Sequence, residues 1–123
     1  MSFSIGEFSE LVGIPSSTLR FYEKEGLITP DRDKNNLRTY SEEDANWLKF
    51  LLHLKGAGLS IEELKQYTIW RAAGDSTISE RLNMLKEKKI VLEQEIENLQ
   101  KNLDTVVRKI GIYEEKVKTR RVS

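Results

Sequence analysis

The segment with the most evident chemistry is S-S-T-L-R-F-Y-E-K-E-G-L, residues 16–27. If this segment is a helix, Leu19 and Tyr22 share one face, because side chains three and four positions apart are neighbours. Either the core also reaches the opposite face, or a phenylalanine lies in solvent beside two cations. That opposite face carries Ser17, Arg20, Phe21 and Lys24.

Duplex DNA would give the second face a function. Arg20 offers a planar fork that suits guanine edges or phosphate, and Phe21 fits against a sugar or a thymine methyl group. Ser17 and Thr18 add short hydroxyls near the helix N-terminus, which itself favours phosphate. The alternative is that Phe21 packs under the following hairpin while Arg20 pairs with Glu23 on the same helix.

Cations recur on two neighbouring elements. Arg32, Lys34 and Arg38 lie on a predicted hairpin, from which they can reach backbone phosphates. Lys55 precedes a Gly-Ala-Gly break, and the helix that starts at Ser60 should present free N–H groups to another phosphate. Any one of these cations alone is more often an ordinary solvated charge. Their recurrence around the same helix favours a nucleic-acid interface.

Groups for enzymatic chemistry are scarce. The chain has no cysteine, one histidine and no glycine-rich phosphate loop, so thiolate chemistry and zinc or copper sites have almost no ligands. His53 lies in an apolar helix, where a histidine is more often a packed and hydrogen-bonded residue than a catalyst or ligand. We therefore predict that the protein is not an enzyme and has no metal site and no cofactor.

Composition favours a mostly helical protein, with 38% apolar and 33% charged residues among 123. No apolar run approaches the roughly 20 residues that cross a bilayer, and the N-terminus lacks a signal-peptide pattern, so we expect a cytoplasmic protein without membrane contact. Net charge is zero, and residues 1–75 carry 9 Lys and Arg against 12 Asp and Glu. This balance argues against a DNA partner unless the acidic groups face away from it.

Local signals predict a helix-turn-helix at the N-terminus. Residues 4–7, S-I-G-E, have the form of a capping box, and the helix that follows should stop at Gly13. After a tight turn, a second helix should start at Ser16 or Ser17 and end at Gly26. Two short helices joined by such a turn are typical of DNA-binding proteins.

A hairpin and two more helices should follow. Residues 27–40 hold two β-leaning segments around D-R-D-K-N-N, whose Asn and Asp residues suit a turn. A helix capped by Ser41 should break at residues 56–58, and another should run from Ser60 to residues 73–75. The predicted fold is therefore mostly α, with an N-terminal winged helix-turn-helix.

A heptad stripe dominates the C-terminal part of the chain. Its residues alternate steps of four and three over five repeats, which is the pattern of a coiled-coil seam. The helix would be about 54 Å long, too long for a small head to cover. Burying the ten apolar stripe residues from Leu82 to Val117 would contribute on the order of 15–30 kcal/mol before entropic costs, so we predict a homodimer. The stripe comprises Ile78, Leu82, Leu85, Lys89, Leu92, Ile96, Leu99, Leu103, Val106, Ile110, Tyr113 and Val117.

The stripe leaves some choices open. Lys89 either extends outward from the seam or fixes its register at a cost in stability. A helix that folds back on itself is a weaker alternative, because the run contains no proline and no turn signal. A coiled-coil adaptor that binds another protein is the alternative function.

We predict a DNA-binding domain in residues 1–75, and a dimerisation helix with a short tail in residues 76–123.

The stretches S-I-G-E-F-S-E-L-V-G-I-P-S-S-T-L-R-F-Y-E-K-E-G-L-I, R-T-Y-S-E-E-D and G-A-G-L-S-I-E-E-L together resemble MerR-type transcription regulators of bacteria. The resemblance covers essentially the whole chain. It implies that a winged helix-turn-helix binds promoter DNA and that the long helix pairs antiparallel with that of a second copy. It also implies that the dimer distorts the promoter and thereby controls transcription by RNA polymerase.

Residue by residue, the resemblance implies a set of DNA contacts on the second helix, the wing and the second turn. Such regulators usually have tyrosine at the position of Phe21, so a phosphate hydrogen bond from a hydroxyl there should be missing. The implied contact residues are Ser16, Ser17, Thr18, Arg20, Phe21, Tyr22, Lys24, Arg38, Tyr40, Lys55 and Ser60.

Residues 47–67 and 74–85 are similar to the aldehyde- and thiol-stress branch of that family. Members of this branch often place a reactive cysteine where this chain has His53, and the chain has no thiol with which to repeat that chemistry. His53 is then a candidate effector position that senses protonation or a small ligand, with simple packing as the commoner alternative. The residues name no inducer, operator or target gene, and they fit activation and repression equally.

Overall fold

The protein was studied as a computed structural model that describes residues 2–122. Contacts group the chain into two units, the first ending at Leu85 and the second starting at Lys86. We call residues 2–85 the head and residues 86–122 the rod. Met84 and Leu85 group with the head because they pack against its core. The functional division after residue 75 stays a prediction, since this grouping reflects packing and not function.

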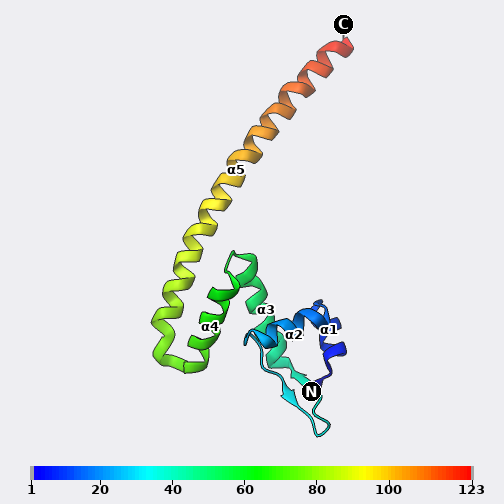
Figure 1. Cartoon of the computed structure of the whole chain (residues 1–123). Coiled ribbons are helices and arrows are strands. Elements are labelled where there is room, and N and C mark those ends of the chain that lie inside the picture. Colours follow the sequence, from blue (N-terminus) through cyan, green and yellow to red (C-terminus); the bar gives the residue numbers. More distant parts are fainter. Residues whose placement is uncertain (1, 123) are drawn as a thin grey trace. The chain divides into compact units, whose positions relative to one another are not determined.

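The helix-turn-helix consists of α1 (Ile5–Val12) and α2 (Ser16–Lys24), which lie against each other in the head (Figure 1). The predicted capping box starts α1: the Ser4 hydroxyl accepts from the Glu7 N–H at 3.2 Å, and the Glu7 carboxylate accepts from the Ser4 N–H at 2.9 Å. Gly13 ends the helix with a φ of 72°, a left-handed conformation that favours glycine.

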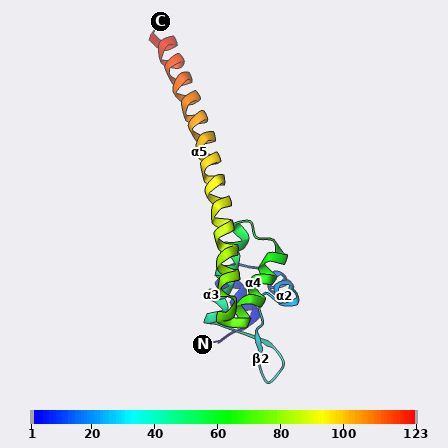
Figure 2. The ribbon, with the colours of Figure 1, turned by 90° about the vertical axis from the view of Figure 1, so that its left-hand side faces the viewer.

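A small antiparallel sheet of β1 (Ser2–Phe3), β2 (Asp31–Arg32) and β3 (Arg38–Ser41) has the order β1-β3-β2. β2, β3 and the turn between them form the wing, which projects from the rest of the head (Figure 2). Its turn is closed by the Asp33 carboxylate, which accepts two backbone N–H groups at 2.8 and 3.0 Å. Asn36 supplies the left-handed position, with a φ of 62°.

Two capped helices follow the wing and complete the described part of the head before α5. α3 (Glu42–Gly56) starts at a capping box between Ser41 and Asp44. α4 (Ile61–Ala73) starts at a second one between Ser60 and Glu63. Each box satisfies two backbone N–H groups at the helix start, which explains why these boundaries were readable from the sequence.

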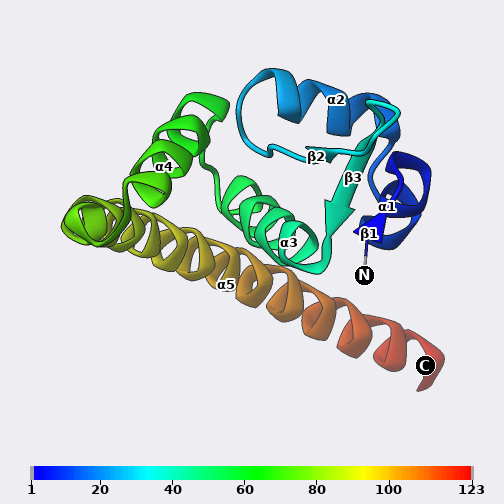
Figure 3. The ribbon, with the colours of Figure 1, turned by 90° about the horizontal axis from the view of Figure 1, so that it is seen from below.

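The head core is one apolar cluster built from α1, α2, α3, α4, β3 and the connections between them. At its centre the rings of Phe8 and Tyr40 stack with centroids 4.3 Å apart, which joins α1 to the wing strand. Figure 3 shows β3 running between α1 and α3. The buried members are Phe8, Leu19, Tyr22, Leu27, Ile28, Tyr40, Ala45, Leu48, Leu51, Leu54, Leu59, Leu64 and Tyr67.

A 3₁₀ turn, η1 (Gly74–Thr77), connects α4 to α5 (Ile78–Val122), and the rod is the part of α5 beyond Leu85. The rod is one unbroken helix whose apolar side chains are mostly exposed. Across residues 2–122, no helix is both long enough and apolar enough to span a bilayer. The predicted mostly α fold, with a winged helix-turn-helix and a long C-terminal helix, is confirmed.

Candidate nucleic-acid interface

α2 has two chemically different faces. Leu19 is fully buried and Tyr22 is 4% exposed, while Phe21 on the other side is 45% exposed. Its neighbours on that outer face, Ser17, Arg20 and Lys24, are exposed as well. Phenylalanine therefore lies in solvent beside two cations, as the helical spacing of the sequence indicated.

The two cations of this face are unneutralised. Among the residues that the structure describes, neither Arg20 nor Lys24 forms an ion pair. The alternative pairing of Arg20 with Glu23 is not realised, because Glu23 turns to the wing and binds two other arginines there. The face thus combines positive charge with an exposed ring and leaves both available to a polyanion.

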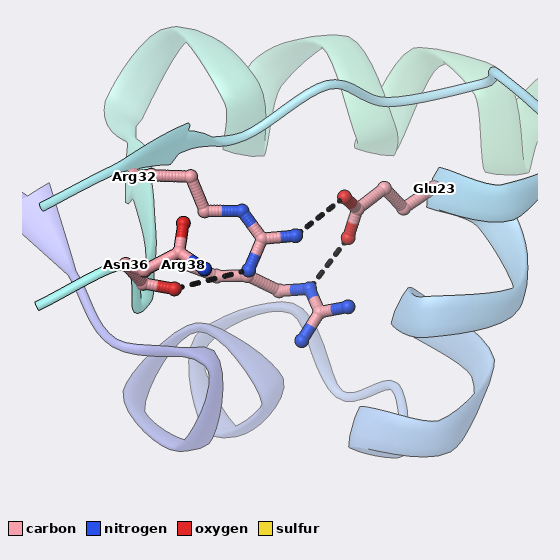
Figure 4. Close-up of polar contacts among 4 residues, drawn as sticks. All are labelled: Glu23, Arg32, Asn36 and Arg38. Carbon is pink, nitrogen blue, oxygen red and sulfur yellow. Dashed lines mark hydrogen bonds and ion pairs between the residues drawn. The ribbon is translucent and has the colours of Figure 1, made fainter.

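The wing is fastened to α2 by a single carboxylate (Figure 4). Glu23 accepts from Arg32 Nη2 at 3.0 Å through one oxygen and from Arg38 Nε at 2.5 Å through the other. Arg32 also donates to the Asn36 backbone carbonyl at 3.4 Å, which holds the side chain against the turn. A charge-assisted pair of this kind fixes geometry as well as contributing energy.

We call the ion pairs of Glu23 with Arg32 and Arg38 the Glu23 clamp. The clamp shifts the pKa values of Glu23 and Arg38. The hydrogen bond from Arg38 lowers the pKa of Glu23 below its ordinary value of 4.5, and the charges of Arg38 and Arg32 add to that effect. The same hydrogen bond raises the pKa of Arg38. Glu23 therefore remains a carboxylate well below neutral pH, and the wing stays attached to α2.

The N-terminus of α2 differs from those of the other head helices. Its N-cap is Pro15, which makes no side-chain cap hydrogen bond, whereas α1, α3 and α4 all begin with capping boxes. Ser16 and Thr18 are half-buried there and Ser17 is exposed. Uncapped N–H groups at a helix start bind phosphate well, so this end of α2 suits a DNA backbone.

Two tyrosines of the predicted contact set lie inside the head. Tyr40 has no exposed surface, burial raises its pKa, and its hydroxyl has no hydrogen-bond partner among residues 2–122. Tyr22 is almost fully buried, and its hydroxyl oxygen accepts from Lys55 Nζ at 3.3 Å. Both side chains position the interface from beneath. Their direct contact with DNA remains a prediction, because the two side chains expose little surface in this conformation.

Lys55 is exposed in the last turn of α3, directly before the second turn, which connects α3 to α4. The Ser60 hydroxyl already accepts from the Glu63 N–H at 3.1 Å, and the Glu63 carboxylate accepts from the Ser60 N–H at 3.0 Å. Fewer free N–H groups remain at this helix start than the sequence suggested. Lys55 is the stronger phosphate candidate of this turn.

The remaining candidate residues lie outside this surface. His53 is exposed on α3 and makes no side-chain hydrogen bond within the described part of the chain. In the predicted seam, Leu85 and Leu92 are half-buried and the other positions are exposed, with Ile96 at 65% and Leu99 at 67%. The full predicted set is Leu82, Leu85, Leu92, Ile96, Leu99, Leu103, Val106, Ile110 and Tyr113.

Sequence reasoning missed an aromatic hollow in the head. The rings of Trp47, Phe50 and Tyr67 lie within 6.3 Å of one another, and the Arg71 guanidinium lies 4.0 Å from the Trp47 ring centre. The spacing of Trp47 and Phe50 on one helix was the available signal. The hollow has a volume of about 530 Å³ and is lined by Glu43, Asn46, Trp47, Phe50, Tyr67, Arg71 and Arg81.

Comparison with known sequences places this geometry in a family. The profile described as "MerR HTH family regulatory protein" matches residues 3–68, and the profile described as "MerR, DNA binding" matches residues 45–108. An uncharacterised HTH-type transcriptional regulator of Haemophilus influenzae is 33% identical over 115 residues, which cover 93% of this chain and 85% of that protein. The HTH-type transcriptional regulator AdhR of Bacillus subtilis is 39% identical over 87 residues, or 70% of this chain and 62% of that protein.

A solved structure shares the fold along most of the chain. It is the crystal structure of HiNmlR, described as a MerR family regulator that lacks the sensor domain and is bound to promoter DNA. The two structures superpose with a TM-score of 0.85 at 33% identity, over 94% of this chain and 92% of HiNmlR. With both profiles and relatives of this extent, the chain belongs to the MerR family of helix-turn-helix transcriptional regulators.

Proposed function

We propose that this protein binds promoter DNA through the outer face of α2, flanked by the wing and by Lys55 of the second turn. One observation carries the proposal: within residues 2–122, Arg20 and Lys24 form no ion pair, and both are exposed on the same face as the ring of Phe21. The uncapped start of α2 supports it, and so does the likeness to HiNmlR, which is described as bound to promoter DNA. Direct readout would come from Arg20, and Phe21 would give apolar contact.

A chain with zero net charge can bind DNA if its acidic groups are engaged elsewhere. Glu7, Asp44 and Glu63 serve in capping boxes. Glu23 binds the two wing arginines, and Glu25 pairs with Lys65 at 3.0 Å. The outer face of α2 is therefore locally positive even though the total charge is not.

The proposed active species is a homodimer held together by the rod. Apart from Leu92, the large apolar side chains from Ile90 to Val117 are 42–67% exposed, and burial of such surface is the main driving force for association. A second copy offers the same stripe and can cover it by two-fold symmetry. Two heads would then contact two half-sites of one promoter, and distortion of the DNA between them would alter its use by RNA polymerase.

The proposal extends to the aldehyde- and thiol-stress branch of the family, on the resemblance of residues 47–67 and 74–85. The chain has no cysteine, so its signal must act without a thiol. The exposed imidazole of His53 is accessible to protons and small ligands, which supports its candidacy as an effector position. Unchanged promoter output from His53→Gln across pH and candidate aldehydes would remove that role.

The test of DNA binding uses fluorescence anisotropy on fragments from upstream of the chain's own gene. We expect log affinity to fall steeply with log salt, and Arg20→Ala to cost about 1–3 kcal/mol of binding free energy. Lys49→Ala, which removes an exposed cation on α3, is the matched control and should change affinity little. A coiled-coil adaptor would show no salt-dependent DNA affinity, and no binding at low ionic strength would refute the proposal.

A further inference from the structure

The aromatic hollow of the head has the features of a small-molecule site. Its lining residues come from α3, α4 and the start of α5, and none of them belongs to the predicted DNA-contact set. We propose that the hollow binds a small planar carboxylate, of which an aromatic acid is the simplest example. Its volume of about 530 Å³ suits such a ligand, since ligand pockets of proteins span about 300–1,000 Å³.

Three aromatic rings form the apolar part of the hollow. The ring centres of Trp47 and Phe50, both on α3, lie 6.0 Å apart. The Tyr67 ring centre, on α4, lies 6.3 Å from that of Trp47 and 5.7 Å from that of Phe50. Phe50 is still 36% exposed. A flat apolar ligand can stack against these rings and cover the exposed surface, so the body of the ligand should be planar.

Two arginines give the hollow its positive charge. Arg71 of α4 and Arg81 of α5 both line it, and among residues 2–122 neither forms an ion pair. Among the described lining residues only Glu43 is acidic, and it is exposed. A ligand cation would also have to compete with Arg71, whose guanidinium already lies 4.0 Å from the Trp47 ring centre. The local excess of positive charge therefore favours an anion.

The guanidinium of Arg81 is held in place by the chain itself. Its Nη2 donates to the Gly74 carbonyl at 2.8 Å, and its Nε donates to Thr77 Oγ1 at 3.2 Å. Its Nη1 makes no hydrogen bond within the described part of the chain. The two N–H groups of Nη1 therefore remain for a ligand, and their fixed position lowers the entropic cost of binding.

Arg71 offers a second set of donors. Its guanidinium lies against the Trp47 ring and makes no hydrogen bond to any residue that the structure describes. Guanidinium N–H groups match the two oxygens of a planar carboxylate in spacing and direction. An aromatic acid joins such a carboxylate to a flat ring, so the arginines and the aromatic side chains of the hollow can bind both parts of one molecule.

Benzoate is the probe for this site, and Trp47 reports its binding. The chain has two tryptophans, of which Trp47 lines the hollow and Trp70 does not. Their indole N–H groups give separate resonances in nitrogen–proton correlation NMR spectra of the full chain, and Trp70→Phe assigns them. We expect benzoate to move the Trp47 resonance saturably, with a dissociation constant on the order of 1 mM, and to move the Trp70 resonance much less.

Three related compounds separate the charge of the ligand from its ring. Benzamide has the ring without the negative charge, and acetate has the carboxylate without the ring. Each should bind at least about 10-fold more weakly than benzoate, because each loses one of the two kinds of contact. Benzyltrimethylammonium keeps the ring but carries a positive charge, and it should bind more weakly than benzamide.

Substitutions in the lining should change benzoate affinity in opposite directions. Arg71→Gln should weaken binding about 10-fold, and it removes no hydrogen bond of the described head. Arg81→Gln should also weaken binding, but it releases the turn that Arg81 anchors, so Arg71→Gln is the decisive variant. Glu43→Gln should tighten binding about 2- to 5-fold, because it removes a negative charge. Lys49→Gln, which changes an exposed cation of α3 outside the lining, should leave the dissociation constant unchanged.

Three results would overturn the proposal. A Trp47 resonance that does not move at roughly 50 times the expected dissociation constant would show that Arg71 or a second copy of the chain already fills the hollow. Benzamide or benzyltrimethylammonium binding as tightly as benzoate would refute the carboxylate. Unchanged benzoate affinity in Arg71→Gln would place the ligand elsewhere. The titration contains no DNA, so its outcome and that of the DNA-binding test are independent.

Discussion

The head buries most of its large apolar side chains, whereas the rod exposes most of them. In the head, thirteen side chains form one buried cluster, and residues such as Phe8 and Leu48 have no exposed surface. In the rod, most side chains of the same kinds are exposed, as Ile96 and Leu99 illustrate at 65% and 67%. The head therefore buries its apolar side chains within the chain, whereas the rod leaves apolar surface that the proposed second copy would cover.

The largest expected effect comes from a substitution in the rod, and it concerns dissociation of the proposed dimer. Leu99→Ala removes a predicted seam residue twice per dimer, and each loss should cost about 2 kcal/mol or more, so the dissociation constant should rise by roughly 700-fold or more. Sedimentation equilibrium measures the change. Ile112→Ala, an exposed rod residue outside the seam, is the control, and an equal effect from it would break the distinction between seam and surface.

The head side is tested by Phe8→Ala. Phe8 is fully buried and stacks on Tyr40, so its loss should lower the free energy of unfolding by about 3–5 kcal/mol. Urea melts of the head signal give the value. Phe21→Ala removes a ring of the same size from an exposed position and should change stability by less than about 0.5 kcal/mol. A large destabilisation by Phe21→Ala would mean that α2 has no free outer face.

The Glu23 clamp adds a smaller, pH-dependent effect within the head. Because the pKa of Glu23 is lowered on folding, its stabilisation is fully present above the ordinary value of 4.5 and is lost as pH falls through the lowered pKa. Glu23→Gln should cost about 1 kcal/mol at pH 7, and the difference from the natural chain should vanish in acid.

Urea melts from pH 3 to pH 7 measure this difference. Glu10→Gln, which changes an exposed carboxylate on α1, should give a flat difference over the same range. A Glu23→Gln difference that persists unchanged at pH 3 would contradict the clamp.

Phe21→Tyr should have the smallest effect. It tests whether the exposed outer face of α2 contacts DNA. A hydroxyl on the outer face of α2 adds one donor for a phosphate, which should strengthen DNA binding about 2- to 5-fold. Stability should not change, because the ring is already exposed. Anisotropy titrations at constant salt measure the gain, and weaker binding would indicate that the ring packs against an apolar part of the DNA.

Local signals were enough to predict most of the fold. The serine and acidic residues of the capping boxes and the left-handed Gly13 act within a few residues of each other. The two faces of α2 follow in the same way from helical spacing, which places Leu19 inward and Phe21 outward.

Other features depend on contacts that span many residues, and the sequence did not reveal them. Glu23 meets Arg38 fifteen positions away, and the nearer Arg20 offered a simpler partner by spacing. The burial of Tyr40 depends on its stacking against Phe8 in another element. Periodicity within one helix carries no information about such pairings, which only the assembled head determines.

The wing and α2 are joined by the Glu23 carboxylate, which binds Arg32 and Arg38 at the same time. Because of these ion pairs, a movement of one element pulls on the other. If the wing lies on one DNA strand while α2 lies in the DNA groove, the two elements move as one lever-like unit. A force that the duplex exerts on one element is then transmitted to the other. The stiffness of that lever, set by one side chain, would then limit how far this regulator can deform its promoter.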